Sequence, residues 1–122
     1  SKPPFNEKVT INSALKSLKF YYKIAEVYVA LINRKIVGVI VFKLEQYWEE
    51  KVFIIEDLAV MEEFKERSIG KRLLNFIEYY AKNKNIKRIL FTTNKKSKAI
   101  NFYKKLGYKE EKTRINFSKK LK

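Results

Sequence analysis

The sequence predicts an α/β fold, with a mixed, mainly antiparallel sheet and one central strand–helix–strand crossover. Stretches rich in β-branched and aromatic residues, such as Ala25–Ile32, alternate with stretches in which apolar residues recur every three to four positions. Residues 52–81 join a strand to a long amphipathic helix through a short polar loop that closes on Gly70. A strand–helix–parallel strand connection of this kind is right-handed in nearly all proteins.

Length and composition indicate a single folded domain over residues 1–122. Of these residues, 46% are hydrophobic and 15% aromatic, which is typical of a globular chain with one core. No apolar run reaches the roughly 20 residues that a membrane span needs. The first residues lack the apolar core of a secretory signal. We therefore expect a cytoplasmic protein with no membrane partner.

The charged and reactive residues narrow the chemistry. There is no cysteine and no histidine, so thiolate chemistry is excluded, no metal is expected, and proton transfer must use Glu, Asp, Lys, Tyr or water. The chain carries 28 Lys and Arg against 13 Asp and Glu, a net charge of +15. Such a surface attracts polyanions, either nucleic acid or a phosphorylated cofactor. Because the basic residues are scattered along the chain, compositional bias accounts for most of this charge.

The N-terminal part is expected to form a helix and a β-hairpin. Residues 9–22 have apolar side chains at helical spacing, although they begin with three β-branched residues. Ala25–Ile32 and residues 36–45 are strands joined by a turn at residues 33–35. Gly38 inside the second strand indicates a bulge or a close approach of backbone.

The C-terminal part is expected to continue with a strand, a helix and further strands. Residues 86–93 have the composition of a strand, and residues 97–106 that of a helix ending at Gly107. The tail beyond this glycine alternates well enough for one or two strands, with Ile115 and Phe117 as its main apolar residues. The apolar stripe of the central helix is assigned to the core and given no function: Ile69, Leu73, Leu74, Ile77, Tyr80 and Ala81.

The loop between the central strand and helix, residues 65–70, is a natural anion site. The first N–H groups of a helix lack intrahelical partners, and the helix dipole favours negative charge there. A P-loop needs GxxxxGK followed by Ser or Thr, but Lys65 stands at the first glycine and Arg72 at the hydroxyl position. A dinucleotide fingerprint needs three glycines, and this loop has one. Neither phosphate-binding motif fits.

Two blocks of sequence resemble the motifs of the GNAT superfamily of N-acetyltransferases. The stretch IIEDLAVMEEFKERSIGKRLL resembles the acetyl-CoA-binding motif Gln/Arg-x-x-Gly-x-Gly/Ala, with Lys65, Ser68 and Gly70 at its fixed positions. The stretch AINFYKKLGY resembles the family's second signature, Phe-Tyr-x-x-x-Gly-Phe/Tyr, with Tyr103 as the tyrosine. The resemblance covers about residues 27–108. The sequence of the first block is most similar to those of diamine and spermidine acetyltransferases.

The resemblance implies a twisted GNAT sheet with helices on both faces and an absent or abbreviated first strand. It also implies direct transfer of acetyl from acetyl-CoA to a primary amine. The backbone of residues 58–60 would bind the pantetheine arm, with one N–H stabilising the oxyanion. The loop N–H groups would bind the pyrophosphate, with added charge from Arg67, Lys71 and Arg72. The implied cofactor-binding residues are Leu58, Ala59, Val60, Lys65, Glu66, Arg67, Ser68, Ile69, Gly70, Lys71, Asn94 and Tyr103.

The resemblance gives catalytic roles to Glu56 and Tyr103. Glu56 matches the glutamate taken as the base in polyamine-acetylating relatives, and Tyr103 matches the tyrosine that protonates the departing CoA thiolate. Tyr103 also belongs to an ordinary apolar stripe.

Strand alternation separates the two adjacent carboxylates. It places Glu56 on the face of Ile54 and Leu58, and Asp57 on the face of Ile55. For Asp57, an ion pair with a lysine of a neighbouring strand is expected.

Several residues depart from the family pattern. Ser68 puts a Cβ where backbone must approach a pyrophosphate, so we expect an ordinary φ/ψ there, or a hydroxyl that binds phosphate or caps the helix. Lys65 replaces Gln or Arg. Lys96 stands at the family's asparagine position, and Asn94 lies two residues earlier. These changes predict weaker cofactor binding. Trp48 either lines the acceptor pocket or covers the edge of the core.

Two alternatives stay open beside the N-acetyltransferase. A basic nucleic-acid-binding domain fits the charge, but the sequence lacks an RNP motif, a helix-turn-helix pattern and a zinc site. A GNAT fold that only binds acyl-CoA, without catalysis, fits the departures at Ser68 and Lys65. The acceptor could be a small amine, a lysine side chain or a protein N-terminus. Dimerisation is common in the family and is not decided by the sequence.

Overall fold

The computed structural model describes residues 9–13, 25–47, 49–65, 68–113 and 115–121, which form two compact units, Ser1–Phe91 and Thr92–Lys122. The first unit contains β1 (Val9–Ser13), β2 (Ala25–Ile32), β3 (Lys35–Tyr47), β4 (Glu50–Val60), the short 3₁₀-helix η2 (Glu62–Phe64), α2 (Ile69–Asn83) and β5 (Ile89–Leu90). The second unit contains α3 (Ile100–Lys105).

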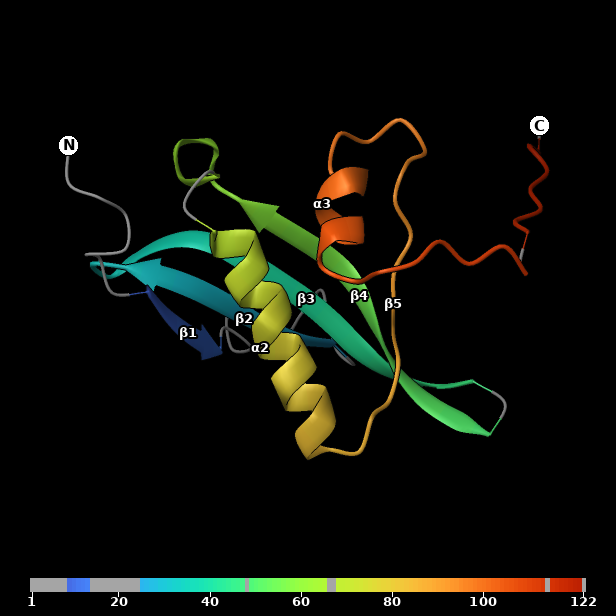
Figure 1. The fold of residues 1–122 in the computed structure, drawn as a ribbon, viewed down its shortest axis with the longest axis horizontal. Helices are drawn as coiled ribbons and strands as arrows, with labels where there is room; N and C mark the ends of the chain where they lie inside the picture. The colour runs from blue at the N-terminus through green and yellow to red at the C-terminus, as the bar shows by residue number, and fades with distance from the viewer. Residues whose placement is uncertain (1–8, 14–24, 48, 66–67, 114, 122) are drawn as a thin grey trace. The chain divides into compact units, whose positions relative to one another are not determined.

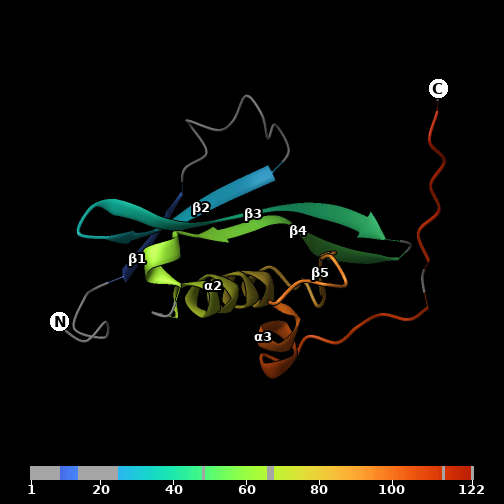
Figure 2. The same ribbon diagram turned by 90° about the horizontal axis from the view of Figure 1, so that it is seen from above.

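The first unit is a five-stranded sheet of order β1-β2-β3-β4-β5 with α2 along one face (Figures 1 and 2). The pairs from β1 to β4 are antiparallel, and β4 and β5 are parallel, joined by α2. The predicted hairpin is confirmed: Asn33 and Arg34, with φ of 50° and 69°, turn β2 into β3. A two-residue turn with two positive φ angles matches the twist of the strands. The mixed, mainly antiparallel fold class is therefore confirmed.

The core of this unit lies between the sheet and α2. The helix buries its predicted stripe of Ile69, Leu73, Leu74, Ile77 and Ala81, while Tyr80 is only partly buried. Its hydroxyl donates a hydrogen bond to Glu26 Oε1 at 2.7 Å, so Tyr80 joins the core by its ring and keeps a polar contact at its tip. No helix among the described residues is long and apolar enough to cross a membrane.

Gly38 lets α2 approach β3. A Cβ built on Gly38 would lie 2.9 Å from Cγ2 of Ile69 and 3.1 Å from Cδ1 of Leu73. The pairing of β2 with β3 also shifts register next to this glycine, between Ala30 and Leu31. The register shift confirms the predicted bulge, and the short distances show that side chains of the first turns of α2 pack directly over Gly38.

The prediction of a helix over residues 9–22 is wrong at its start. Val9–Ser13 is a strand that pairs antiparallel with β2, from Val9 opposite Ile32 to Ser13 opposite Tyr28. Its β-branched residues Val9, Thr10 and Ile11 favour a pleated surface with cross-strand neighbours over a helix. The remainder of the predicted helix, residues 14–24, lies outside the described residues.

Two further predicted strands are corrected. The strand predicted at residues 86–93 is reduced to Ile89–Leu90. It starts late because Ile86 is buried and its N–H donates to the carbonyl of Ala81 at 2.8 Å, which closes the end of α2. In the tail, the described residues form no strand, and Ile115 and Phe117 are 79% and 90% exposed. Alternation alone therefore does not form a strand there, because a strand also needs a paired neighbour and a buried face.

Candidate active site

The central strand β4 has two neighbours over its first half and one over its second. It pairs with β3 along its whole length, but with β5 only through Phe53 and Ile54. Within the described part of the first unit, no strand lies beside the other edge of β4 from Asp57 to Val60. We call this edge the open edge.

A β-bulge at Glu56 separates the half of β4 with two neighbours from the half with one. Val41 of β3 lies opposite Asp57, and the next residue, Phe42, lies opposite Ile55, so Glu56 is the extra residue on β4. Because Val41 and Phe42 are adjacent, Asp57 and Ile55 lie on opposite faces of the sheet. The prediction that they share a face is therefore wrong.

The bulge also changes which backbone groups face the open edge. Before it, the N–H of Phe53 donates to Arg88 O at 3.1 Å, toward β5. After it, the N–H of Met61 donates to Val37 O at 2.8 Å, toward β3. These two residues are an even number of positions apart and would point to the same edge in an uninterrupted strand. The extra residue therefore reverses the direction of the backbone groups.

Leu58 and Val60 consequently direct their N–H and C=O groups to the open edge, while Ala59 pairs with Val39 on β3. The same change of phase places Ile54 and Leu58 on opposite faces, which corrects the prediction that both share the face of Glu56. The open edge therefore offers two N–H donors and two carbonyl acceptors in strand geometry.

The helix α2 begins next to this edge in sequence, with Ser68 at its N-cap. Ser68 has φ 60° and ψ 24°, the left-handed region, and makes no capping hydrogen bond through its side chain. The expectation of an ordinary φ/ψ is wrong, and so is the expectation of a helix cap. Its carbonyl accepts the N–H of Arg72 at 3.0 Å, which starts the helix. Because a left-handed conformation disfavours any residue with a Cβ, Ser68 carries strain that glycine would not.

The first turn of α2 supplies donors and positive charge. The N–H groups of Ile69, Gly70 and Lys71 have no acceptor within the helix, because the carbonyl four positions back lies before its start. Lys71 and Arg72 are exposed. Lys65 lies before the turn and pairs with Glu62, Nζ to Oε1, at 3.3 Å. Three predicted site residues, Trp48, Glu66 and Arg67, lie outside the described residues.

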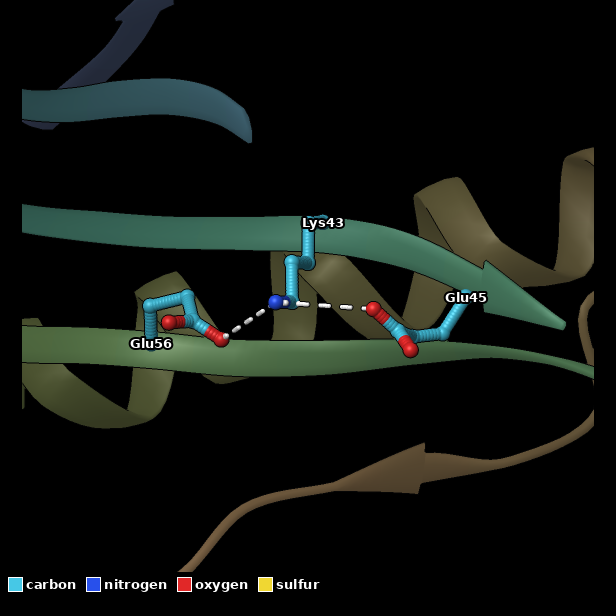
Figure 3. A network of polar contacts seen from close by, with 3 residues as sticks. All are labelled: Lys43, Glu45 and Glu56. Carbon is cyan, nitrogen blue, oxygen red and sulfur yellow. Dashed lines mark ion pairs between the residues drawn. The ribbon is translucent and has the colours of Figure 1, made fainter. Parts of the chain in front are cut away.

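A three-residue ion-pair network contains Glu56 (Figure 3). Lys43 Nζ lies 3.6 Å from Glu56 Oε2 and 3.4 Å from Glu45 Oε2. The network lies on the face of the sheet away from α2, which runs behind the strands in Figure 3. The neighbouring-strand lysine expected to pair with Asp57 pairs with Glu56 instead. Lys43 lies opposite Ile54, and Glu56 follows Ile54 by two residues, so strand alternation places the Glu56 carboxylate on the face of Lys43.

The second unit contains the other two predicted site residues. Asn94 Oδ1 accepts the N–H of Lys96 at 2.8 Å, and its carbonyl accepts the N–H of Ser97 at 2.9 Å. These bonds, with Ser97 Oγ accepting the N–H of Ala99 at 3.1 Å, hold residues 94–99 as turns. The helix α3 therefore starts at Ile100 rather than at the predicted residue 97.

Tyr103 lies in α3, and the end of this helix is as predicted. Gly107 has φ 95°, and its N–H donates to Lys104 O at 3.0 Å while the N–H of Tyr108 donates to Tyr103 O at 3.1 Å. This pair of bonds is the Schellman motif. Burial raises the pKa of the Tyr103 hydroxyl above its usual value, so this group keeps its proton throughout the neutral range.

The family comparison agrees with the two motifs. Residues 5–108 match the model of the acetyltransferase (GNAT) family. The chain belongs to this family. It is accordingly an acyltransferase, and acetyl-CoA is its co-substrate. A search of the curated proteins gives no match to the chain.

Solved structures of GNAT enzymes have the same fold. An aminoglycoside acetyltransferase from an uncultured soil metagenomic sample, in complex with sisomicin, is 18% identical, with 99% of this chain and 100% of that chain covered and a TM-score of 0.76. The aminoglycoside N-acetyltransferase AAC(6')-Iy with CoA is 14% identical, with 94% and 97% covered and a TM-score of 0.76. An acetyltransferase of Trypanosoma brucei is 14% identical, with 91% and 99% covered and a TM-score of 0.75.

Sequence reasoning missed the bulge and the two other members of the ion-pair network, Lys43 and Glu45. A signal for the bulge was present in VFIIEDLAV, where two adjacent charged residues interrupt an apolar strand. Two consecutive polar side chains do not fit the alternation of a half-buried strand, and a bulge resolves the conflict. The alternating Lys43 and Glu45 share a face of β3 and were equally visible in the sequence.

Proposed function

We propose that this protein is a cytoplasmic N-acetyltransferase that transfers acetyl from acetyl-CoA to a primary amine, with Glu56 as the base and Tyr103 as the acid. The single observation that carries the proposal is the bulge at Glu56, which joins a carboxylate to the start of the open edge of β4. Adjacent sites for a base and for an extended ligand are what an amine acetyltransferase needs.

The hydrogen-bonding groups and charges of these residues support the proposed binding of acetyl-CoA. The backbone groups of Leu58 and Val60 are suited to the amides of a pantetheine arm, as a further strand would be. One of these N–H groups would stabilise the oxygen on which negative charge develops. The N–H groups of residues 69–71, with Lys71 and Arg72, are suited to a pyrophosphate. The motif also assigns Lys65, Glu66, Arg67 and Asn94 to this part of the ligand, although the side-chain oxygen of Asn94 is engaged in its own turn.

Glu56 and Tyr103 would move the two protons of the reaction. A lysine-type amine has a pKa of about 10.4 and is therefore mostly protonated and unreactive at neutral pH. Glu56, held as a partly exposed carboxylate beside the open edge, would take the proton from the amine. Tyr103, whose pKa is raised by burial, would give its proton to the CoA sulfur. The proposed acceptor classes are small amines, lysine side chains and protein N-termini; the α-amino group of an N-terminus has a lower pKa of about 8.

The first test is binding. Thermal unfolding should be measured with and without acetyl-CoA, since a ligand at 100 times its dissociation constant stabilises the folded state by about 2.7 kcal/mol. A rise in melting temperature is expected. The absence of any shift at millimolar acetyl-CoA would overturn the proposal.

The second test is turnover on spermidine, a lysine peptide and an aminoglycoside, followed by release of the CoA thiol. Glu56→Gln should lower kcat by roughly 10²-fold or more, as expected for loss of a general base, whereas the matched change Asp57→Asn should have only a small effect. Tyr103→Phe should lower kcat far more than it raises the KM for acetyl-CoA. Binding of acetyl-CoA without turnover on any amine would instead favour an acyl-CoA-binding protein without catalysis.

A further inference from the structure

The protein already holds a primary amine against its proposed base. Lys43 Nζ lies 3.6 Å from Glu56 Oε2 and 3.4 Å from Glu45 Oε2. Its side chain is 26% exposed, so solvent reaches it but most of it is enclosed. An ammonium group between two carboxylates is in the position that an external amine would have to take in order to lose its proton to Glu56.

Lys43 also lies opposite the residue of β4 at which the pairing with β5 ends. It lies opposite Ile54 on β4, and Ile54 is the last residue of β4 to pair with β5. The bulge at Glu56 and the open edge follow directly. The lysine amine, the carboxylate and the start of the open edge therefore belong to one short stretch of the sheet (Figure 3).

From this arrangement we propose that Lys43 is itself an acceptor, and that the protein acetylates its own Lys43 within one molecule. The inference rests on the proposed function, because it uses the same base and the same co-substrate, acetyl-CoA. The Lys43 ammonium gives one proton to the Glu56 carboxylate. The neutral amine then forms a bond to the acetyl carbonyl carbon, and the C–S bond to CoA breaks. The second proton of the nitrogen goes to the departing sulfur.

The products are Nε-acetyl-Lys43 and the CoA thiol, and Glu56 returns its proton to water. The modification removes the positive charge from the network and leaves the carboxylates of Glu45 and Glu56 without their shared cation. A cationic external amine is then attracted to the place that Lys43 held. Self-acetylation would in this way prepare the base for an external acceptor.

Lys35 provides an internal control on the same strand. It too pairs with a carboxylate, Glu63, at 3.7 Å, and its side chain is 55% exposed. Acetyl-CoA in solution modifies exposed amines without a catalyst, so uncatalysed acetylation should favour Lys35. Acetylation assisted by Glu56 should favour Lys43.

The experiment is a time course with the full chain and acetyl-CoA at neutral pH, followed by peptide mapping with mass spectrometry. Lys43 should be acetylated at least about 10-fold faster than Lys35. Glu56→Gln should slow the acetylation of Lys43 by a similar factor, as expected for loss of a general base, without changing the rate of acetylation of Lys35. The rate per molecule should not change on dilution of the protein. Lys43→Arg, which keeps the positive charge, should remove the rapid addition of one acetyl group from the intact mass.

Three results would overturn the inference. If acetyl-CoA stabilises the protein and external amines are acetylated, but Lys43 reacts no faster than Lys35, the inference fails and the proposed function stands. If Lys43 is acetylated at a rate per molecule that falls on dilution, the transfer is between molecules. If acetyl-CoA does not stabilise the protein at all, the inference and the proposed function fail together.

Discussion

The two halves of β4 differ in burial and in strand pairing. In the first half, Val52, Phe53 and Ile55 are buried, and pairing with β3 is joined by pairing with β5. In the second half, Asp57 and Ala59 are exposed, and β3 is the only strand partner among the described residues of the first unit. One strand thus serves the core over half its length and presents backbone groups over the other half. The residue between the halves, Glu56, is the bulge.

The largest effect is expected from Phe53→Ala in the buried half. The Phe53 ring packs 5.0 Å from that of Phe42 and 5.8 Å from that of Tyr80, between centroids. Its truncation should lower the free energy of unfolding by about 3–5 kcal/mol, whereas Asp57→Ala in the exposed half should change it by about 0.5 kcal/mol or less. Urea denaturation measures both. Equal losses at the two sites would mean that the halves do not differ as described.

Proline substitutions test the direction of the backbone groups within the second half. Ala59→Pro removes an N–H that bonds to β3 and should destabilise the fold by about 1–3 kcal/mol, because a carbonyl of β3 loses its partner in the ladder. Val60→Pro removes an N–H that faces the open edge, where proline is tolerated, and should lower acetyl-CoA affinity more than stability. Calorimetric titration with acetyl-CoA and thermal unfolding separate the two outcomes. A reversed pattern would contradict the assigned direction.

A smaller effect is expected at Ser68, after the open half. A non-glycine residue in the left-handed region costs roughly 1–2 kcal/mol, partly offset by the greater unfolded entropy of glycine, so Ser68→Gly should stabilise the fold by about 0.5–1 kcal/mol. It should also strengthen acetyl-CoA binding, because it removes a Cβ beside the proposed pyrophosphate site. Ser68→Ala is the control, since it keeps the Cβ and should give neither gain. A loss of affinity in both variants would instead indicate that the hydroxyl binds the ligand.

The regular elements were predictable because local signals and tertiary packing agree. The hairpin of β2 and β3 has alternating residues and a short polar turn, and the apolar stripe of α2 matches its buried face. Gly107 was found as a helix end because only glycine adopts its φ of 95° without cost. In each case one short stretch of sequence contains all the information that the element needs.

The errors arise where a distant partner decides the structure. Val9–Ser13 was included in a helix because of the apolar spacing that follows it, but it is a strand because β2 is available to pair with it. Ile115 and Phe117 alternate without a partner among the described residues and form no strand. The bulge depends on the register between β3 and β4, which the residues of β4 alone do not determine. The pairing of Lys43 with Glu56 follows from that register, so the active-site motif was predictable while the environment of its base was not.

The most direct test of the central claim is hydrogen exchange at the backbone amides of β4, measured by NMR with and without CoA. Leu58 and Val60 should exchange readily in the free protein and become protected when CoA is bound, because their N–H groups face the open edge. Ala59, already bonded to β3, should be protected in both states. If CoA binds and leaves the exchange of Leu58 and Val60 unchanged, the open edge of β4 is not the site of the co-substrate.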